Sequence, residues 1–344
     1  MYLIKNLKKN NVIVAKNVNV SKIIKESIYM QNSTGKFTVK FRGIRGSYPT
    51  PEKSFLEIGG NTSCVEVNVG GHLIVLDAGT GIISLGNELM KEHIASSDEM
   101  FQRTPINATV LLSHIHADHI QGFNFFKPLN ILTSRIKVYG FSDYGETLES
   151  NLQNLLYGKS FPICMNDVAA DMEISNITEG EVLIFDQNSP IPVRKRVISA
   201  DDITPVGDEV IVSCMKSFSH GTEGVMIYKI AYKDKNIVYA TDKESYIGAD
   251  KKLAFFARNT DLLIHDSQFT GEDYLSPIAP KQGFGHSTFE MAIETAKAAQ
   301  AKQLAFFHFD PSYDDEKLKN IEKYYKNQFE GCFMAYEGCE TVLL

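Results

Sequence analysis

Four residues that can bind metal ions lie within six positions in the segment LLSHIHADHIQG, residues 111–122. They are His114, His116, Asp118 and His119. The apolar run before them predicts a strand, and side chains alternate along a strand, so His114 and His116 point to the same side of its end. Asp118 and His119 would open the next helix and face the same space. Imidazoles and a carboxylate held this close together favour a divalent cation over a merely polar loop.

Further single histidines and aspartates follow apolar runs later in the chain. His220 comes after IVSCMKSFS, Asp242 after NIVYAT, the pair His265-Asp266 after DLLI, and His308 after QLAFF. Each of them alone is more often a core or surface residue than a ligand. Catalytic groups of layered α/β proteins gather at the carboxyl ends of strands, however. The repeated position therefore predicts that these residues join the first cluster.

Composition limits the classes of protein that remain. The chain has 344 residues, with 43% hydrophobic and 22% charged residues, which is ordinary for a globular protein with one large or two modest domains. A net charge of −7 argues against a protein that lives on a polyanion, although a local basic patch stays open. Five scattered cysteines without a C-x-x-C pair indicate reduced thiols. No secretion signal or membrane span is predicted, so we expect a cytoplasmic protein.

Hydrophobic periodicity predicts the elements that must position these residues. Strands are expected at 37–42, 64–69, 72–76, 108–112, 136–140, 210–216, 225–232, 236–240, 261–264, 303–307 and 340–344. Helices are expected at 82–94, at 143–157, from a capping box at 287–290 to about 301, and at 315–329. Strands come first and then alternate with helices, which indicates a layered α/β protein with sheets inside and helices outside.

Two segments stand apart from this pattern. Residues 1–36 are rich in lysine and β-prone, which predicts an N-terminal extension, as a hairpin that pads the fold or pairs with another subunit, or as a basic arm for nucleic acid. Residues 188–209 have the composition of an insertion and carry the basic triplet 194–196. We expect one catalytic domain at 37–344, interrupted by that insertion.

The motifs together resemble a known family. HIHADH followed by a lone His, a lone Asp and a late His is similar to the metallo-β-lactamase fold. The motifs HDSQ (265–268), GHST (285–288) and FHFD (307–310) resemble its ribonuclease Z and phosphodiesterase branch. The turns RGSYPTP, GGNTSCVEV and LDAGTGI are similar to the cyclic-nucleotide phosphodiesterases within that branch. The resemblance implies a four-layer αββα sandwich of two mixed β-sheets with helices outside.

The resemblance also implies a role for each residue. One metal would be bound by three histidines, the second by Asp118 and two histidines, and Asp242 would bridge the two metals. The histidines are His114, His116 and His220 for the first ion, and His119 and His308 for the second. Such nitrogen-rich ligands without thiolates favour Zn²⁺, with Mn²⁺ as the alternative.

The residues expected to act in catalysis are Asp118, His286 and Asp266. His286 of GHST would be the general acid, and Asp266 would orient it through a hydrogen bond. Asp77 is expected to orient a histidine ligand from behind, and His265 to be structural.

We therefore expect a binuclear-metal phosphodiesterase that opens a 3′,5′-cyclic nucleotide to its monophosphate and forms a homodimer. One alternative is a ribonuclease Z-like endonuclease that processes tRNA 3′ ends. The modest basic triplet, and Asp-Ser-Gln rather than Glu-Ala-Thr after His265, count against that alternative. A non-catalytic metal-binding protein is the next alternative, and the GHST element disfavours a lactamase or thioester hydrolase.

Overall fold

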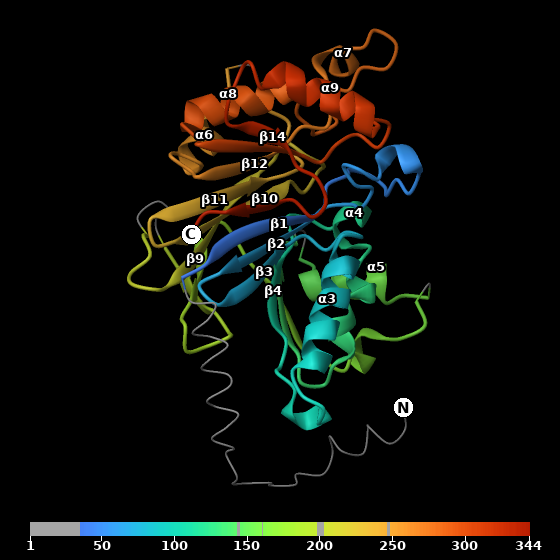
Figure 1. The fold of residues 1–344 in the computed structure, drawn as a ribbon, viewed down its shortest axis with the longest axis vertical. Coiled ribbons are helices and arrows are strands. Elements are labelled where there is room, and N and C mark those ends of the chain that lie inside the picture. Colours follow the sequence, from blue (N-terminus) through green and yellow to red (C-terminus); the bar gives the residue numbers. More distant parts are fainter. Residues whose placement is uncertain (1–34, 143–144, 160, 198–202, 246–247) are drawn as a thin grey trace.

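The computed structural model describes residues 35–142, 145–159, 161–197, 203–245 and 248–344. Most of the predicted N-terminal extension, residues 1–34, lies outside the described residues. In the part that the structure describes, the strands form two mixed sheets, and helices cover the outer face of each (Figure 1). The predicted four-layer αββα sandwich is confirmed. Among the described residues, no helix is both long enough and apolar enough to cross a membrane.

The first sheet has seven described strands in the order β15-β1-β2-β3-β4-β5-β6. Their bounds are β15 Glu340–Val342, β1 Phe37–Gly43, β2 Cys64–Val69, β3 His72–Leu76, β4 Asn107–Leu111, β5 Arg135–Gly140 and β6 Asp171–Asn176. Strands β3 to β6 are parallel, whereas β15, β1, β2 and β3 pair antiparallel. The carboxyl ends of β3 and β4 therefore meet at one edge, which is where Asp77 and the HIHADH segment follow.

The second sheet has eight described strands in the order β14-β13-β12-β11-β10-β9-β7-β8. Their bounds are β14 Cys332–Met334, β13 Gln303–Phe307, β12 Leu262–Asp266, β11 Lys235–Ala240, β10 Val225–Tyr232, β9 Val210–Ser217, β7 Glu181–Phe185 and β8 Val193–Arg196. Strands β11 to β14 are parallel, so three of the predicted site residues leave the sheet at the same edge.

The core lies between the sheets and under the helices. One apolar cluster fills the space between the two sheets and extends beneath α8, and a second lies between the first sheet and helices α3 and α5. The helices are α3 Ile82–Ala95, α4 Ala117–Ile120, α5 Leu148–Leu156, α6 Lys251–Phe256, α7 Gly271–Tyr274, α8 Phe289–Ala299 and α9 Asp315–Tyr325. Short 3₁₀ turns lie at Lys53–Phe55, Met100–Gln102, Phe123–Phe125, Lys127–Asn130 and Met165–Asp167. Burial of an apolar face, rather than helix propensity, holds these short helices in place.

Three predictions of local structure need correction. Helix 143–157 begins later, at Leu148, because Thr147 caps it by accepting from the Ser150 backbone N–H at 3.1 Å. The predicted insertion contains β8, which pairs antiparallel with β7 and extends the second sheet. The capping box predicted at 287–290 does not form: Thr288, not Ser287, caps α8 by accepting from the Met291 backbone N–H. Strands β6, β7 and β14 and helices α6 and α7 were not predicted.

Candidate metal centre

The predicted site residues follow the ends of strands from both sheets. His114 and His116 come after β4, and His220 comes after β9. Asp242 follows β11, and His308 follows β13 directly. The facing edges of the two sheets bring these side chains together across nearly two hundred residues of sequence. Their donor atoms include two groups of three, which we call the imidazole half and the carboxylate half, and Asp242 lies between them.

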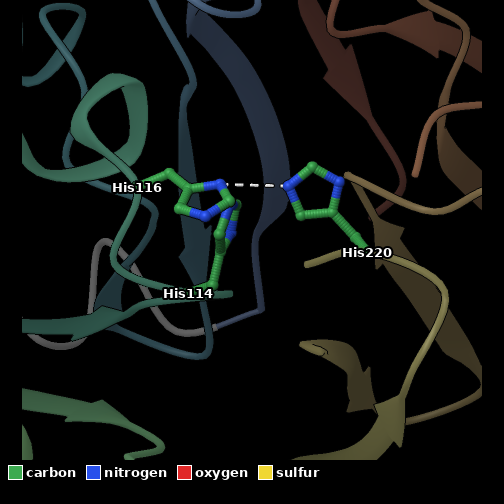
Figure 2. Close-up of side chains that lie close together, drawn as sticks. All are labelled: His114, His116 and His220. Atoms are coloured by element: carbon green, nitrogen blue, oxygen red, sulfur yellow. Dashed lines mark hydrogen bonds between the residues drawn. The ribbon is translucent and has the colours of Figure 1, made fainter. Parts of the chain in front are cut away.

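The imidazole half consists of His114, His116 and His220 (Figure 2). Their ligand atoms lie within 4.8 Å of one another, and Nε2 of His220 is 3.0 Å from Nδ1 of His116. Nδ1 of His220 donates to the carbonyl oxygen of Gly285 at 3.2 Å, which leaves a lone pair on Nε2. Nε2 of His114 is buried and has no hydrogen-bond partner among the described residues. A buried imidazole nitrogen without a partner fits a metal ion at this position.

The carboxylate half consists of Asp118, His119 and His308. Oδ2 of Asp118 lies 3.4 Å from Nε2 of His119 and 3.2 Å from Nε2 of His308, and the two imidazole nitrogens are 3.2 Å apart. All three residues are buried. His116, by contrast, is exposed, so the centre opens to solvent on the side of the imidazole half.

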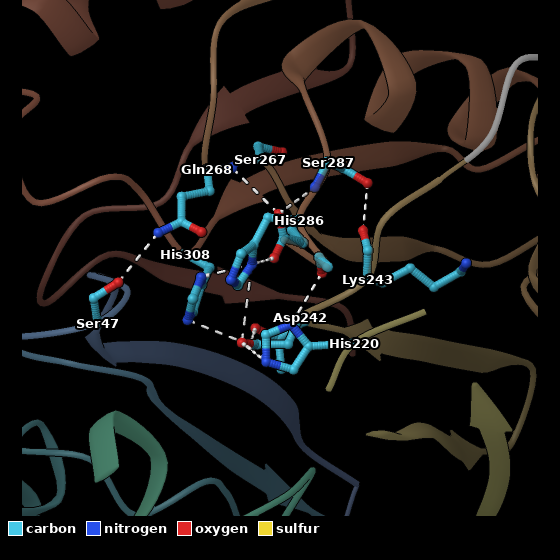
Figure 3. Close-up of polar contacts among 12 residues, drawn as sticks. Ser47, His220, Asp242, Lys243, Ser267, Gln268, His286, Ser287 and His308 are labelled. Atoms are coloured by element: carbon cyan, nitrogen blue, oxygen red, sulfur yellow. Dashed lines mark hydrogen bonds and ion pairs between the residues drawn. The ribbon is translucent and has the colours of Figure 1, made fainter. Parts of the chain in front are cut away.

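Asp242 lies between the two halves, and each of its oxygens faces one of them (Figure 3). Oδ1 is 3.7 Å from Nε2 of His114 and 3.5 Å from Nε2 of His220. Oδ2 is 3.1 Å from Nε2 of His119 and 3.3 Å from Nε2 of His308. A carboxylate placed in this way can be shared by two cations. The donor set as a whole, rich in nitrogen and oxygen and without sulfur, suits divalent metals.

The protonation of the histidines differs between the halves. Loss of water around the ring lowers the pKa of the buried His114 and His220 and also that of His116, so these imidazoles stay neutral and able to bind a metal. Burial acts in the same direction on His119 and His308, but the nearby carboxylates outweigh it. They raise the pKa of His119 well above its ordinary value and that of His308 to about 9. Without a metal, these two histidines therefore carry protons that balance the acids.

Asp77 lies behind the carboxylate half. Its Oδ2 accepts from Nδ1 of His119 at 2.8 Å and from the Tyr239 hydroxyl at 2.7 Å. Its Oδ1 accepts from the backbone N–H of Ser113 at 2.6 Å. Because a carboxylate can only accept here, His119 must donate from Nδ1, and this fixes Nε2 as the nitrogen that faces the centre. The structure thus gives Asp77 the contact that was expected of it.

His286 lies beside the centre and is held by Asp266 (Figure 3). Nδ1 of His286 donates to Oδ2 of Asp266 at 2.7 Å, and Oδ1 of Asp266 accepts from the Ser287 backbone N–H at 2.9 Å. Nδ1 of His286 is 3.9 Å from Oδ1 of Asp242. This arrangement leaves Nε2 of His286 for a proton transfer. The contact between His286 and Asp266 is the one that the sequence predicted.

His265 makes its hydrogen bond to the backbone of the next residue. Its side chain is fully buried, and Nδ1 donates to the carbonyl oxygen of Asp266 at 2.7 Å. Burial lowers its pKa to about 4. His265 therefore stays neutral in the folded protein and is in none of the candidate metal groups of the described residues.

Several residues that contact the centre were not predicted. The backbone N–H of Ser47 donates to Oδ2 of Asp118 at 2.7 Å. A Cβ atom at Gly46 would lie 2.5 Å from the His308 ring, so only glycine fits against this imidazole. The RGSYPTP motif predicted a turn here, but it gave no sign that the turn contacts Asp118 and His308. Tyr239 reads as an ordinary strand residue, and no sequence signal distinguishes it.

Known proteins are similar to this chain in sequence and in fold. The family model described as beta-lactamase superfamily domain matches residues 72–309. Ribonuclease Z of Pyrococcus furiosus is 22% identical over 328 residues, which cover 87% of this chain and 97% of that protein. Among solved structures, the metallo-beta-lactamase fold protein YhfI from Bacillus subtilis has a TM-score of 0.58 at 17% identity, covering 89% of this chain and 99% of its own. The short form of human tRNase Z has a TM-score of 0.54 at 17% identity, and the match covers 88% of this chain and 98% of that protein.

These likenesses extend over most of the chain and agree with the geometry. The two sheets, the helices outside them and the histidine–aspartate centre at the strand ends all lie within or next to the matched residues. The family model covers more than two thirds of the sequence. The chain therefore belongs to the beta-lactamase superfamily domain family, as a ribonuclease Z-like hydrolase with the metallo-β-lactamase fold.

Proposed function

We propose that this chain is a binuclear-metal phosphodiesterase that cleaves RNA in the manner of its ribonuclease Z relatives. The observation that carries the proposal is the Asp242 carboxylate, which has one oxygen on each half of the centre, with His286 beside it. The ribonuclease Z relatives match nearly their full length, which favours RNA as the substrate. This ranking reverses the expectation from the turn motifs, which favoured a cyclic nucleotide.

The proposed ligands divide as the geometry does. His114, His116 and His220 would bind one ion, Asp118, His119 and His308 the other, and Asp242 both. Two divalent cations, with Zn²⁺ favoured over Mn²⁺ by the nitrogen-rich ligands, would lower the pKa of a water from 15.7 toward about 7 and neutralise the phosphodiester. The chain's own residues supply the remaining chemistry.

Expulsion of a ribose alkoxide is the step that needs a proton. His286 would donate that proton from Nε2 to the leaving oxygen, and Asp266 would hold the ring in place through Nδ1. Asp118 would contribute by holding one of the two metal ions. Asp77 fixes the His119 ring through Nδ1, so that Nε2 would be free to hold a metal ion.

Two exposed aromatic side chains support a substrate that contains nucleotides. Phe218 is 72% exposed and Phe284 is 57% exposed, and each lies two residues before a histidine of the centre. The Lys216 Nζ lies 5.1 Å from the Phe218 ring, and the Lys281 Nζ lies 5.3 Å from the Phe284 ring. Aromatic faces with adjacent cations suit stacking of unpaired bases next to phosphates. Both RNA and a cyclic nucleotide have this chemistry.

A cyclic nucleotide is the second candidate. The basic triplet at 194–196 is a weak surface for RNA, because one of its arginines is paired with an acid. Arg194 donates to both oxygens of Glu181, at 2.8 and 2.6 Å, which neutralises part of the charge that a large RNA would need. The net charge of −7 points the same way. A small substrate requires no such basic surface.

A side-by-side assay ranks the candidates. Precursor tRNA, 3′,5′-cyclic mononucleotides and bis-p-nitrophenyl phosphate are offered to the protein loaded with Zn²⁺ or Mn²⁺. Cleavage of the tRNA at its 3′ trailer supports the first proposal, and turnover of cyclic nucleotides alone supports the second. Less than one equivalent of bound metal, with no hydrolysis of the reporter, would establish a non-catalytic protein instead.

The predicted homodimer and the cytoplasmic location also stay proposals. Sedimentation of the full chain, compared with a chain that lacks residues 1–36, tests whether the extension aids dimerisation. A shift from dimer to monomer on truncation is the expected result. An unchanged dimer would place the subunit contact elsewhere.

A further inference from the structure

A second acid follows Asp242 closely but faces a different group of atoms. Glu244 is only 8% exposed, and its carboxylate accepts three hydrogen bonds. The donors are the Tyr274 hydroxyl at 2.5 Å and the backbone N–H groups of Gly283 at 2.8 Å and Gly285 at 3.0 Å. Backbone hydrogen bonds to a buried carboxylate are strong, because the acceptor is charged. Glu244 therefore fixes the loop that leads into the GHST motif.

Gly285 connects this acid to two residues of the centre. Its carbonyl oxygen accepts from Nδ1 of His220 at 3.2 Å, and the next residue along the chain is His286. Gly285 has a φ of +86°, and a Cβ atom there would lie 2.3 Å from Nδ1 of His220. Only glycine fits so close to the imidazole. The position of Gly285 thus determines where both histidines stand.

Ser287, which follows His286 in the chain, is hydrogen-bonded to the two residues next to Glu244; Figure 3 shows its contact with one of them, Lys243. The Ser287 hydroxyl donates to the carbonyl oxygen of Lys243. It also accepts from the backbone N–H of Ser245 at 3.0 Å. The segment 243–245 therefore contacts the chain both before and after His286. Because this segment starts directly after Asp242, it joins the bridging carboxylate to the proposed general acid.

We propose that Glu244 is a positioning residue that sets His286 at the distance from the metal centre that protonation of the leaving oxygen requires. This inference rests on the proposed phosphodiesterase function. Among the described residues, the hydrogen bonds of the Glu244 carboxylate come from Tyr274, Gly283 and Gly285 and from no ligand residue of the centre. Glu244 therefore acts through Gly285 and the loop that carries His286. Its loss should therefore impair proton donation more than metal binding.

The leaving group separates these two effects. A p-nitrophenolate leaves without a proton, whereas a ribose alkoxide needs one, so bis-p-nitrophenyl phosphate reports on the centre and a ribonucleotide phosphodiester reports on the acid as well. The informative variant is Glu244→Gln. It keeps the shape of the side chain but turns one oxygen into an NH₂ donor that faces a backbone N–H.

For E244Q we expect full metal content and a divided kinetic effect. The rate on the ribonucleotide substrate should fall roughly ten- to a hundredfold, part of the 10²–10⁴ that a general acid supplies, with less than about a threefold fall on the reporter. Tyr274→Phe removes one of the three donors and should change the same ratio less. If E244Q does not fold, the Y274F ratio decides the question.

Asp315→Asn is the matched control. Asp315 is also buried and also accepts two backbone hydrogen bonds, from Glu57 at 2.9 Å and Ile58 at 3.0 Å, but it contacts no residue of the centre. D315N should lower thermal stability and leave the ratio of the two rates unchanged. Equal losses on both substrates in E244Q, or no loss on either, would overturn the proposal. A wild-type protein with bound metal that hydrolyses neither substrate would instead overturn the proposed function.

Discussion

The imidazole half and the carboxylate half differ in exposure, in charge and in the contacts behind their ligands. The imidazole half includes the exposed His116, and loss of water around the rings lowers the pKa of its three histidines and keeps them neutral. The second is buried, rich in carboxylate, and raises the pKa of its histidines. A metal that enters the first half competes with no protons near neutral pH, whereas one that enters the second must displace them. The two positions should therefore differ in affinity and in pH dependence.

The largest effect is expected at Asp242, the residue that belongs to both halves. Asp242→Ala removes the carboxylate oxygens that face four of the histidine ligands, and with them the negative charge that both cations would share. Phosphodiesterase activity should fall by at least roughly 10³-fold, the scale of losing a major electrostatic contact. Metal analysis and reporter hydrolysis check this. Two tightly bound ions in D242A would show that the halves are independent.

His286→Ala tests the chemistry beside the centre. Its ring contacts Asp266 and is not needed to complete either half, so both metals should remain bound. The rate on a ribonucleotide phosphodiester should fall about 10²–10⁴-fold, and that on bis-p-nitrophenyl phosphate much less. A variant that keeps its full rate on the ribose leaving group would contradict the acid assignment.

Asp77→Asn should affect the carboxylate half more than the imidazole half, which Asp77 reaches only through the Ser113 hydroxyl beside His114. The amide can no longer accept every hydrogen bond made by His119, Ser113 and Tyr239, so His119 loses its fixed orientation. Loss of such an orienting contact typically lowers metal affinity about 10–100-fold. Titration with Zn²⁺ against a competing chelator should then show one strongly weakened site and one site that changes less. Equal weakening of both would argue against separate halves.

The smallest effect concerns the stability of the metal-free protein. His308 has a raised pKa of about 9, so its stabilising contribution is present below the unfolded pKa of about 6.5 and is lost as pH rises through 9. His220 has a lowered pKa, so its contribution is lost as pH falls below about 6.5. The contribution of His308 is at most about 3 kcal/mol.

Urea unfolding of the chelator-treated protein across pH 5 to 10 measures these two contributions. The variant H308Q should flatten the alkaline side of the stability profile, and H220Q the acid side. If both variants changed the same side of the profile, the proposed difference in histidine charge between the two halves would be wrong.

Much of the fold could be predicted, because strands with regular burial carry a clear pattern. Strands β2, β3, β10 and β13 have the predicted bounds, and the others that were predicted differ by a residue or two. The edge strands β6, β8 and β14 were missed. Edge strands are short and partly exposed, as β8 with its four exposed residues shows, so their sequence lacks the apolar period of central strands.

The residues of the centre were predictable for a different reason. A lone His or Asp directly after an apolar run is rare enough to be noticed, and His220, Asp242 and His308 all have this context. Ser287 shows the limit of such reasoning. A serine three residues before a glutamate predicts a capping box, but its hydroxyl binds Lys243 and Ser245, and Thr288 caps the helix instead. Contacts between segments forty residues apart outweighed the local pattern.

Two aspartates and one histidine of the site share an unusual backbone conformation with a positive φ angle. Asp77, Asp242 and His308 have φ values of +60°, +51° and +65°, in the left-handed region that residues with a Cβ atom rarely occupy. Each such residue costs of the order of 1–3 kcal/mol unless its surroundings compensate. Glycine would relieve the strain but would remove the functional group. The chain therefore gives up stability where its sheets meet in order to aim these side chains, and binding of metal would restore part of it.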